Sequence, residues 1–72
     1  MNRWMVCVDD GGYAASLEAR KIYEVLADAE AEKMDMVRVI DESGDDYLYP
    51  RERFGEIQIT EEIAAALRRA RA

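Results

Sequence analysis

The sequence has no histidine, one cysteine and no long apolar run, and each of these features argues against a class of protein. Without histidine, the chain lacks the commonest general base and metal ligand. The lone Cys7 cannot form a disulfide within the chain, and no apolar stretch approaches the roughly 20 residues of a membrane-spanning helix. The N-terminus has no basic segment followed by an apolar one, so we expect no secretory signal and a cytoplasmic protein.

The composition is that of one small soluble domain. The 72 residues are 50% apolar and 36% charged, with sixteen acidic and ten basic side chains. The net charge of −6 repels phosphate backbones and anionic lipid surfaces, so we expect neither nucleic acid nor a membrane as partner. A domain of this size buries only about 60–65% of the surface of its unfolded chain, so we expect modest stability.

The possible nucleophiles have no evident base beside them, and we therefore expect no enzyme activity and no cofactor. Cys7 lies in the apolar segment 3–8, where burial lowers thiol reactivity. Ser16 and Ser43 lie in predicted loops, and Thr60 precedes a predicted helix.

A β-hairpin is the clearest local prediction. Residues 36–40 and 46–49 are rich in β-formers, and the intervening acids, serine and glycine favour a chain reversal. Pro50 ends the second strand because it has no N–H to donate. Residues 3–8 and 54–59 are predicted as further strands, and residues 50–53 as a tight turn or a single turn of 3-10 helix.

Residues 14–33 have two interpretations that the pattern leaves open. Alanine, leucine, glutamate, lysine and arginine favour one long helix. The alternative has a loop over residues 16–20, a strand over 21–26 and a short helical turn over 28–33, because β-branched and aromatic residues alternate in the strand segment. The long helix predicts an α+β fold on a three- to four-stranded antiparallel sheet, and the division predicts a mainly β fold.

The C-terminal segment predicts a helix over about residues 60–71. Thr60 is the expected N-cap, and Glu61 and Glu62 suit the first turn because they complement the helix dipole. The expected apolar stripe packs on the same chain or on a second copy, and consists of Ile63, Ala66, Leu67 and Ala70.

Two segments resemble a group of short bacterial and phage proteins, mostly uncharacterised, of the Src-homology-3-like small-barrel type. They are residues 16–26 (SLEARKIYEVL) and residues 47–54 (YLYPRERF), which flank an acidic Ser-Gly hairpin. The resemblance covers about residues 3–59 and implies a five-stranded barrel, with the C-terminal helix as an addition. The sequence departs at Arg20, where the group commonly has glycine. The expected core includes Tyr23, Val25, Val37, Val39 and Leu48.

The resemblance implies a non-enzymatic protein-interaction module whose groove is lined by aromatic residues. Its expected partner-binding residues are Tyr13, Tyr47, Tyr49 and Pro50. The simpler alternative is that Trp4, Phe54 and at least one of Tyr47 and Tyr49 are core residues, because large aromatic side chains bury most area in a small domain.

Two alternatives to the groove remain open. One is an architectural homodimer joined through the C-terminal helix, so either a monomer or a homodimer is compatible with the sequence. The other is weak divalent-cation binding by the acidic loop, through Asp41, Glu42, Asp45 and Asp46. The spacing of these acids does not follow the calcium-loop pattern, and turn formation explains them more simply.

Overall fold

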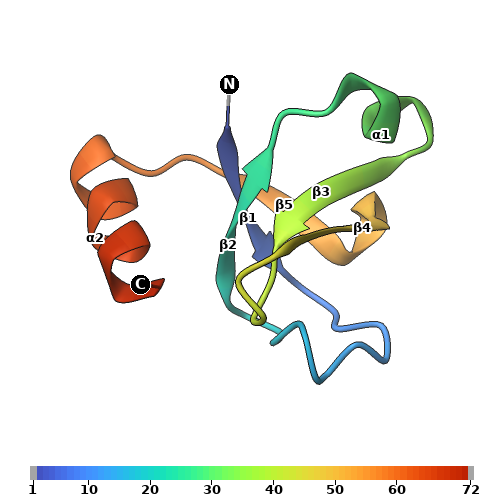
Figure 1. The fold of residues 1–72 in the computed structure, drawn as a ribbon, viewed down its shortest axis with the longest axis horizontal. Coiled ribbons are helices and arrows are strands. Elements are labelled where there is room, and N and C mark those ends of the chain that lie inside the picture. The colour runs from blue at the N-terminus through green and yellow to red at the C-terminus, as the bar shows by residue number, and fades with distance from the viewer. Residues whose placement is uncertain (1, 72) are drawn as a thin grey trace.

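Five short strands form one antiparallel sheet in the computed structural model, which describes residues 2–71 (Figure 1). The order β4-β3-β2-β1-β5 leaves β4 and β5 as the two edges, and the sheet is open. The predicted mainly β fold is therefore confirmed at this level. The strands are β1 (Arg3–Cys7), β2 (Ile22–Leu26), β3 (Met36–Ile40), β4 (Asp46–Pro50) and β5 (Phe54–Ile57).

The three helical segments begin where the sequence offers a cap or a turn. Helix α1 (Ala29–Lys33) follows Asp28, whose Oδ1 accepts a hydrogen bond from the Ala31 N–H (3.0 Å). A 3-10 turn (Arg51–Arg53) follows Pro50. Helix α2 (Glu61–Arg71) begins after Thr60, whose Oγ1 accepts from the Ile63 N–H (3.1 Å), so the predicted N-cap is confirmed.

The long helix over residues 14–33 is wrong, and the divided interpretation is correct. Strand β2 occupies the middle of this stretch and pairs with β1 along most of its length. The preceding loop ends with Arg20 in the left-handed region (φ 76°), which is the position where the resembling proteins have glycine. Two hydrogen bonds with Cys7 hold this turn, since the Arg20 N–H donates to the Cys7 carbonyl and the Cys7 N–H donates to the Lys21 carbonyl. Tertiary pairing therefore overrides helix propensity here.

The core lies on one face of the sheet. Strand alternation turns Met5, Cys7, Tyr23, Val25, Val37 and Val39 to this face, where they join Leu17, Tyr49 and Phe54 in one buried cluster. The expected core residue Leu48 is only half-buried, because it alternates with Tyr49 and so faces the opposite side of β4. Leu17 comes from the loop between β1 and β2, so that loop is anchored to the core.

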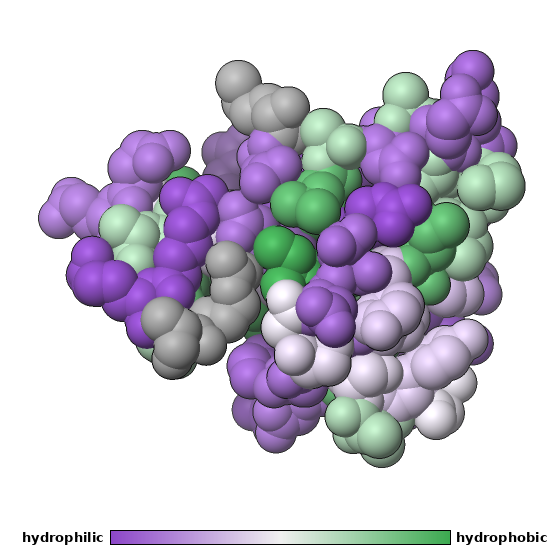
Figure 2. All heavy atoms as spheres, in the orientation of Figure 1, coloured by the Kyte–Doolittle hydropathy of each residue, from purple (hydrophilic) through white to green (hydrophobic). Residues whose placement is uncertain are grey.

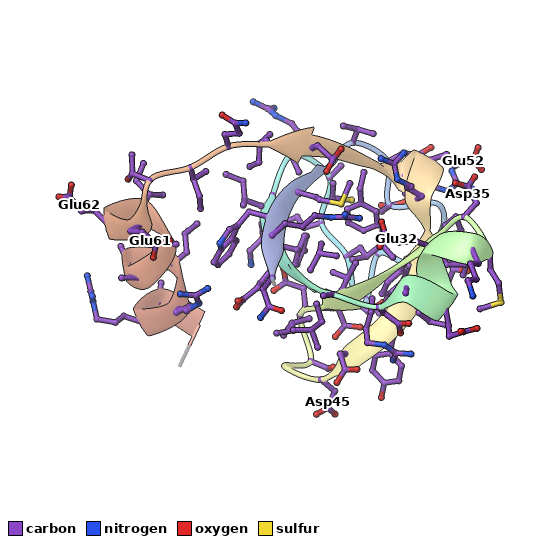
Figure 3. The ribbon with its side chains drawn as sticks, turned by 90° about the horizontal axis from the view of Figure 1, so that it is seen from above. Glu32, Asp35, Asp45, Glu52, Glu61 and Glu62 are labelled. Atoms are coloured by element: carbon purple, nitrogen blue, oxygen red, sulfur yellow. The ribbon has the colours of Figure 1, made fainter. Side chains whose placement is uncertain are left out.

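Helix α2 lies at one end of the molecule, joined to β5 by an extended segment of residues 58–60 (Figures 1 and 3). The predicted apolar stripe is only partly correct. Ala64 is buried and Leu67 is half-buried, but Ala66 and Ala70 are exposed and Ile63 is 49% exposed. Ala64 and Arg68 lie on the side of the helix that faces the sheet. The apolar pattern of the sequence did not predict this position for Arg68, because its side chain is charged. No helix within residues 2–71 meets the length and hydropathy of a membrane crossing.

Candidate functional site

The loop between β1 and β2 presents Tyr13 at the surface, where its ring meets that of Tyr49. The two ring centroids lie 5.2 Å apart at an interplanar angle of 84°, which is the edge-to-face geometry that aromatic pairs favour. Tyr13 is 45% exposed, whereas Tyr49 is buried and also contacts Phe54 at 6.3 Å between centroids. The exposed ring of Tyr13 thus packs on the buried ring of Tyr49.

Hydrogen bonds fix the Tyr49 hydroxyl in place. The Tyr49 O–H donates to Asp41 Oδ2 (2.6 Å), and a hydrogen bond of 2.9 Å joins the Tyr49 and Ser16 hydroxyl groups. Ser16 lies three residues beyond Tyr13 in the same loop. The Tyr49 ring and hydroxyl therefore connect β4 both to the hairpin loop and to the loop that carries Tyr13.

Asp41 is the acceptor at the centre of this network. It is 4% exposed, and its Oδ1 accepts from the N–H and the hydroxyl of Ser43. Burial alone would raise the pKa of Asp41, but the hydrogen bonds from Ser43 and Tyr49 outweigh it and hold the pKa below its ordinary value. For Tyr49, burial and the Asp41 carboxylate both raise the pKa. Near neutral pH, Asp41 is therefore ionised and the Tyr49 hydroxyl protonated, as the hydrogen bond requires.

Local turns hold the loop that carries Tyr13. The carboxylates of Asp9 and Asp10 accept from the N–H groups of Gly11 (2.9 Å) and Gly12 (3.0 Å), respectively. The Tyr13 N–H then donates to the Asp10 carbonyl (2.8 Å), and the Tyr13 carbonyl accepts from the Leu17 N–H. Hydrogen bonds within the loop therefore hold its backbone in place around Tyr13.

The four predicted partner-binding residues do not form one surface. Tyr13 and Tyr49 meet, and Pro50 follows Tyr49 as a half-buried residue at the end of β4. Tyr47 lies two residues before Tyr49 but is 53% exposed, and the ring contacts found within residues 2–71 do not include it. Tyr49 is a supporting core residue, so a partner can reach Tyr13, Tyr47 and Pro50, of which Tyr47 lies outside the Tyr13–Tyr49 contact.

Most of the acidic residues of the predicted metal site bind other side chains of the domain. Asp41 binds Ser43 and Tyr49, Glu42 binds Lys21 and Tyr23, and Asp46 binds Arg38 (3.1 Å). Asp45 is exposed and points away from the domain (Figure 3). Within residues 2–71 no group of three acidic, cysteine or histidine side chains is placed to hold a metal ion. The acids of the hairpin loop therefore serve the turn and its ion pairs.

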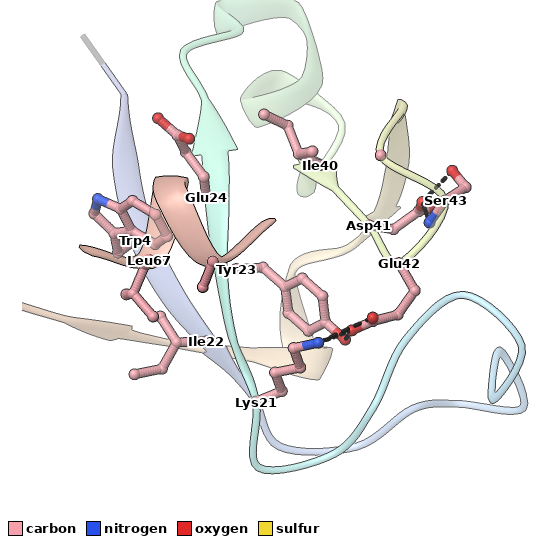
Figure 4. Close-up of a pocket in the computed structure, with 12 residues that line it drawn as sticks. Trp4, Lys21, Ile22, Tyr23, Glu24, Ile40, Asp41, Glu42, Ser43 and Leu67 are labelled. Atoms are coloured by element: carbon pink, nitrogen blue, oxygen red, sulfur yellow. Dashed lines mark hydrogen bonds and ion pairs between the residues drawn. The ribbon is translucent and has the colours of Figure 1, made fainter. Parts of the chain in front are cut away.

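A pocket of about 350 Å³ lies between β2, the hairpin loop and α2 (Figure 4). It occurs where β2 and β3 diverge, since these strands pair only at Val25 and Leu26 of β2. Lys21 and Tyr23 reach across one end to Glu42, with 2.7 Å between Lys21 Nζ and Glu42 Oε2. Lys21 and Tyr23 together lower the pKa of Glu42, and burial with the Glu42 contact raises that of Tyr23.

The other end of the pocket contains an arrangement that sequence reasoning missed. Glu24 is 4% exposed although it lies in the middle of β2, and its Oε2 accepts from Nη2 of Arg68 on α2 (2.9 Å). The Arg68 guanidinium also lies over the Trp4 ring, 5.6 Å from the centroid. A glutamate within an otherwise apolar strand was the available signal, because a carboxylate there requires a partner.

Comparison with known protein families, with curated proteins and with solved structures finds no match for this chain.

Proposed function

We propose that the five strands have the topology of a Src-homology-3-like small barrel. The strand order, the long bonded loop between β1 and β2, the β3–β4 hairpin and the 3-10 turn before β5 support this assignment. The left-handed Arg20 also supports it, because the chain keeps there the backbone conformation that glycine supplies in the resembling proteins.

We further propose that the protein is a non-enzymatic interaction module that binds a partner protein at Tyr13 and Pro50. The observation that carries the proposal is the half-exposed Tyr13 ring held edge-on by a buried, doubly hydrogen-bonded Tyr49. Such a ring is ordered before the partner arrives, so binding costs less conformational entropy.

The surface around Tyr13 indicates the chemistry of the partner. Residues 11–17 (GGYAASL) carry no charge in a chain that is 36% charged, and Figure 2 shows this loop end of the molecule in pale colours of intermediate hydropathy. On the Pro50 side, the Asp35 carbonyl accepts from the Arg51 N–H (3.0 Å), which brings the exposed Asp35 next to the turn that carries the exposed Glu52 (Figure 3). A basic, proline-containing segment suits both the uncharged loop around Tyr13 and the acids near Pro50. Its proline packs on an aromatic ring, and its basic residues pair with the carboxylates.

The test uses the full chain and a synthetic peptide of about ten residues with a Pro-x-x-Pro pattern and flanking arginines. We expect Tyr13→Ala to weaken binding in calorimetry by about tenfold or more, the loss typical of an aromatic contact residue. Tyr47→Ala is the matched control, because it removes an equally exposed tyrosine outside the ring contacts. Equal affinities for the wild type and Tyr13→Ala contradict the proposal, as does an equal loss in both variants.

A further inference from the structure

On the face of the sheet opposite the core, Trp4 and Glu24 hold the guanidinium group of Arg68. Trp4 and Glu24 are direct partners in the β1–β2 register, so their side chains lie side by side on this face. Together they offer an aromatic ring and a buried carboxylate, and Arg68 engages both: its Nη2 and Nε lie 2.9 and 3.2 Å from Glu24 Oε2. The occupant is the chain's own C-terminal helix.

Helix α2 contacts the rest of the domain here through Arg68 and elsewhere through few buried residues. Ala64 is its buried side chain, and much of its remaining surface is half-buried or exposed. The pocket of about 350 Å³, lined by Leu67 and Ala70, separates its C-terminal part from the hairpin loop (Figure 4). The connecting residues 58–60 lie outside the sheet. The helix is thus a small element on an extended connection, with incomplete packing against the domain.

We propose that the Trp4–Glu24 face accepts α2 from a second copy of this chain as well as its own, so that two copies exchange helices and form a dimer. The occupant follows from charge complementarity, because Arg68 of α2 pairs with Glu24 on this face and every copy of the chain carries both the face and the helix. An exchanged helix re-forms the same Arg68–Glu24 ion pair and the same contact with Trp4, which makes exchange a low-cost route to a dimer. This surface lies apart from Tyr13, so the inference is independent of the proposed peptide site.

The test is a pair of full-length charge-reversal variants, Glu24→Lys and Arg68→Glu. Alone, each places like charges between its sheet and its helix. Mixed in equal amounts, they restore opposite charges only when each chain docks its helix on the other. We expect sedimentation analysis and native mass spectrometry to show a heterodimer favoured over either homodimer by about tenfold or more. Arg69→Glu is the matched control, because Arg69 is exposed on the same helix, and its mixture with Glu24→Lys forms no heterodimer.

Two results overturn the inference. The first is a charge-reversed mixture of folded variants that sediments as separate monomers. If circular dichroism shows that a variant is unfolded, the wild type is tested instead. Isotope-labelled and unlabelled wild-type chains are mixed at high concentration and studied by isotope-filtered NMR. The absence of an intermolecular contact between Trp4 and Leu67 is then the second result that overturns the inference. Tyr13→Ala leaves helix exchange unchanged, so failure of the peptide site and failure of the exchange are distinguishable.

Discussion

Replacing Tyr49 by phenylalanine tests the network that holds Tyr13 in place. The change keeps the ring, and with it the edge-to-face contact with Tyr13, but removes the hydroxyl that Asp41 and Ser16 bind. Asp41 is 4% exposed and retains only the two hydrogen bonds from Ser43 to its other oxygen. A hydrogen bond to a charged group contributes about 1.5–3 kcal/mol, so we expect Tyr49→Phe to lower the free energy of unfolding by about 2 kcal/mol.

Urea denaturation followed by the fluorescence of Trp4, the one tryptophan of the chain, measures this loss. Tyr47→Phe is the control, because it removes the hydroxyl of an exposed tyrosine and is expected to change the unfolding free energy by less than about 0.5 kcal/mol. Equal effects of the two substitutions would refute the role assigned to the Tyr49–Asp41 hydrogen bond.

The pH dependence provides a second check on the same bond. Because the folded-state pKa of Asp41 is lowered, the stability from its ionised form is present above its ordinary pKa of 3.8 and is lost as the pH falls through the lower folded value. The difference between wild type and Tyr49→Phe should therefore be constant from about pH 5 to 8 and shrink below about pH 4. A difference that stays constant down to pH values near 2 contradicts the charge-assisted nature of the bond.

Three further predictions concern the backbone and the buried thiol. Arg20→Gly should raise the unfolding free energy by about 1 kcal/mol in urea denaturation, because Arg20 has φ 76°; a loss contradicts the assigned conformation. Gly12→Ala should destabilise in the same assay although a Cβ there has open space, because its φ of 90° is unfavourable for a residue with a side chain; an unchanged free energy contradicts this. Burial raises the pKa of the Cys7 thiol, so its reaction with a thiol reagent should be slower than in urea by about 10³ or more, and similar rates refute its burial.

The elements of the fold were predictable where a local signal agreed with tertiary pairing. The hairpin, the strand end at Pro50 and the Thr60 cap depend on turn and capping chemistry within a few residues, and all three are found. Residues 14–33 were ambiguous because helix propensity opposed pairing between β1 and β2. The prediction that Leu48 belongs to the core was wrong, because apolarity does not specify which face of an edge strand is buried.

The candidate site was less predictable than the fold, because it depends on contacts between distant residues. Tyr13 could be named from the sequence, but its support by Tyr49 joins residues 36 positions apart and depends on the path of the loop. The Arg68–Glu24 pair spans 44 positions, and a long polar side chain on a helix gives no pattern that identifies its partner.

The most direct test of the central claim is an NMR titration of the isotope-labelled full chain with the basic Pro-x-x-Pro peptide. A partner site at Tyr13 and Pro50 predicts that the largest amide shift changes occur in residues 11–17 and 49–52, while Tyr47 and α2 remain unaffected. The claim is contradicted if millimolar peptide leaves the spectrum unchanged, or if the shifts concentrate at the hairpin loop or around Trp4.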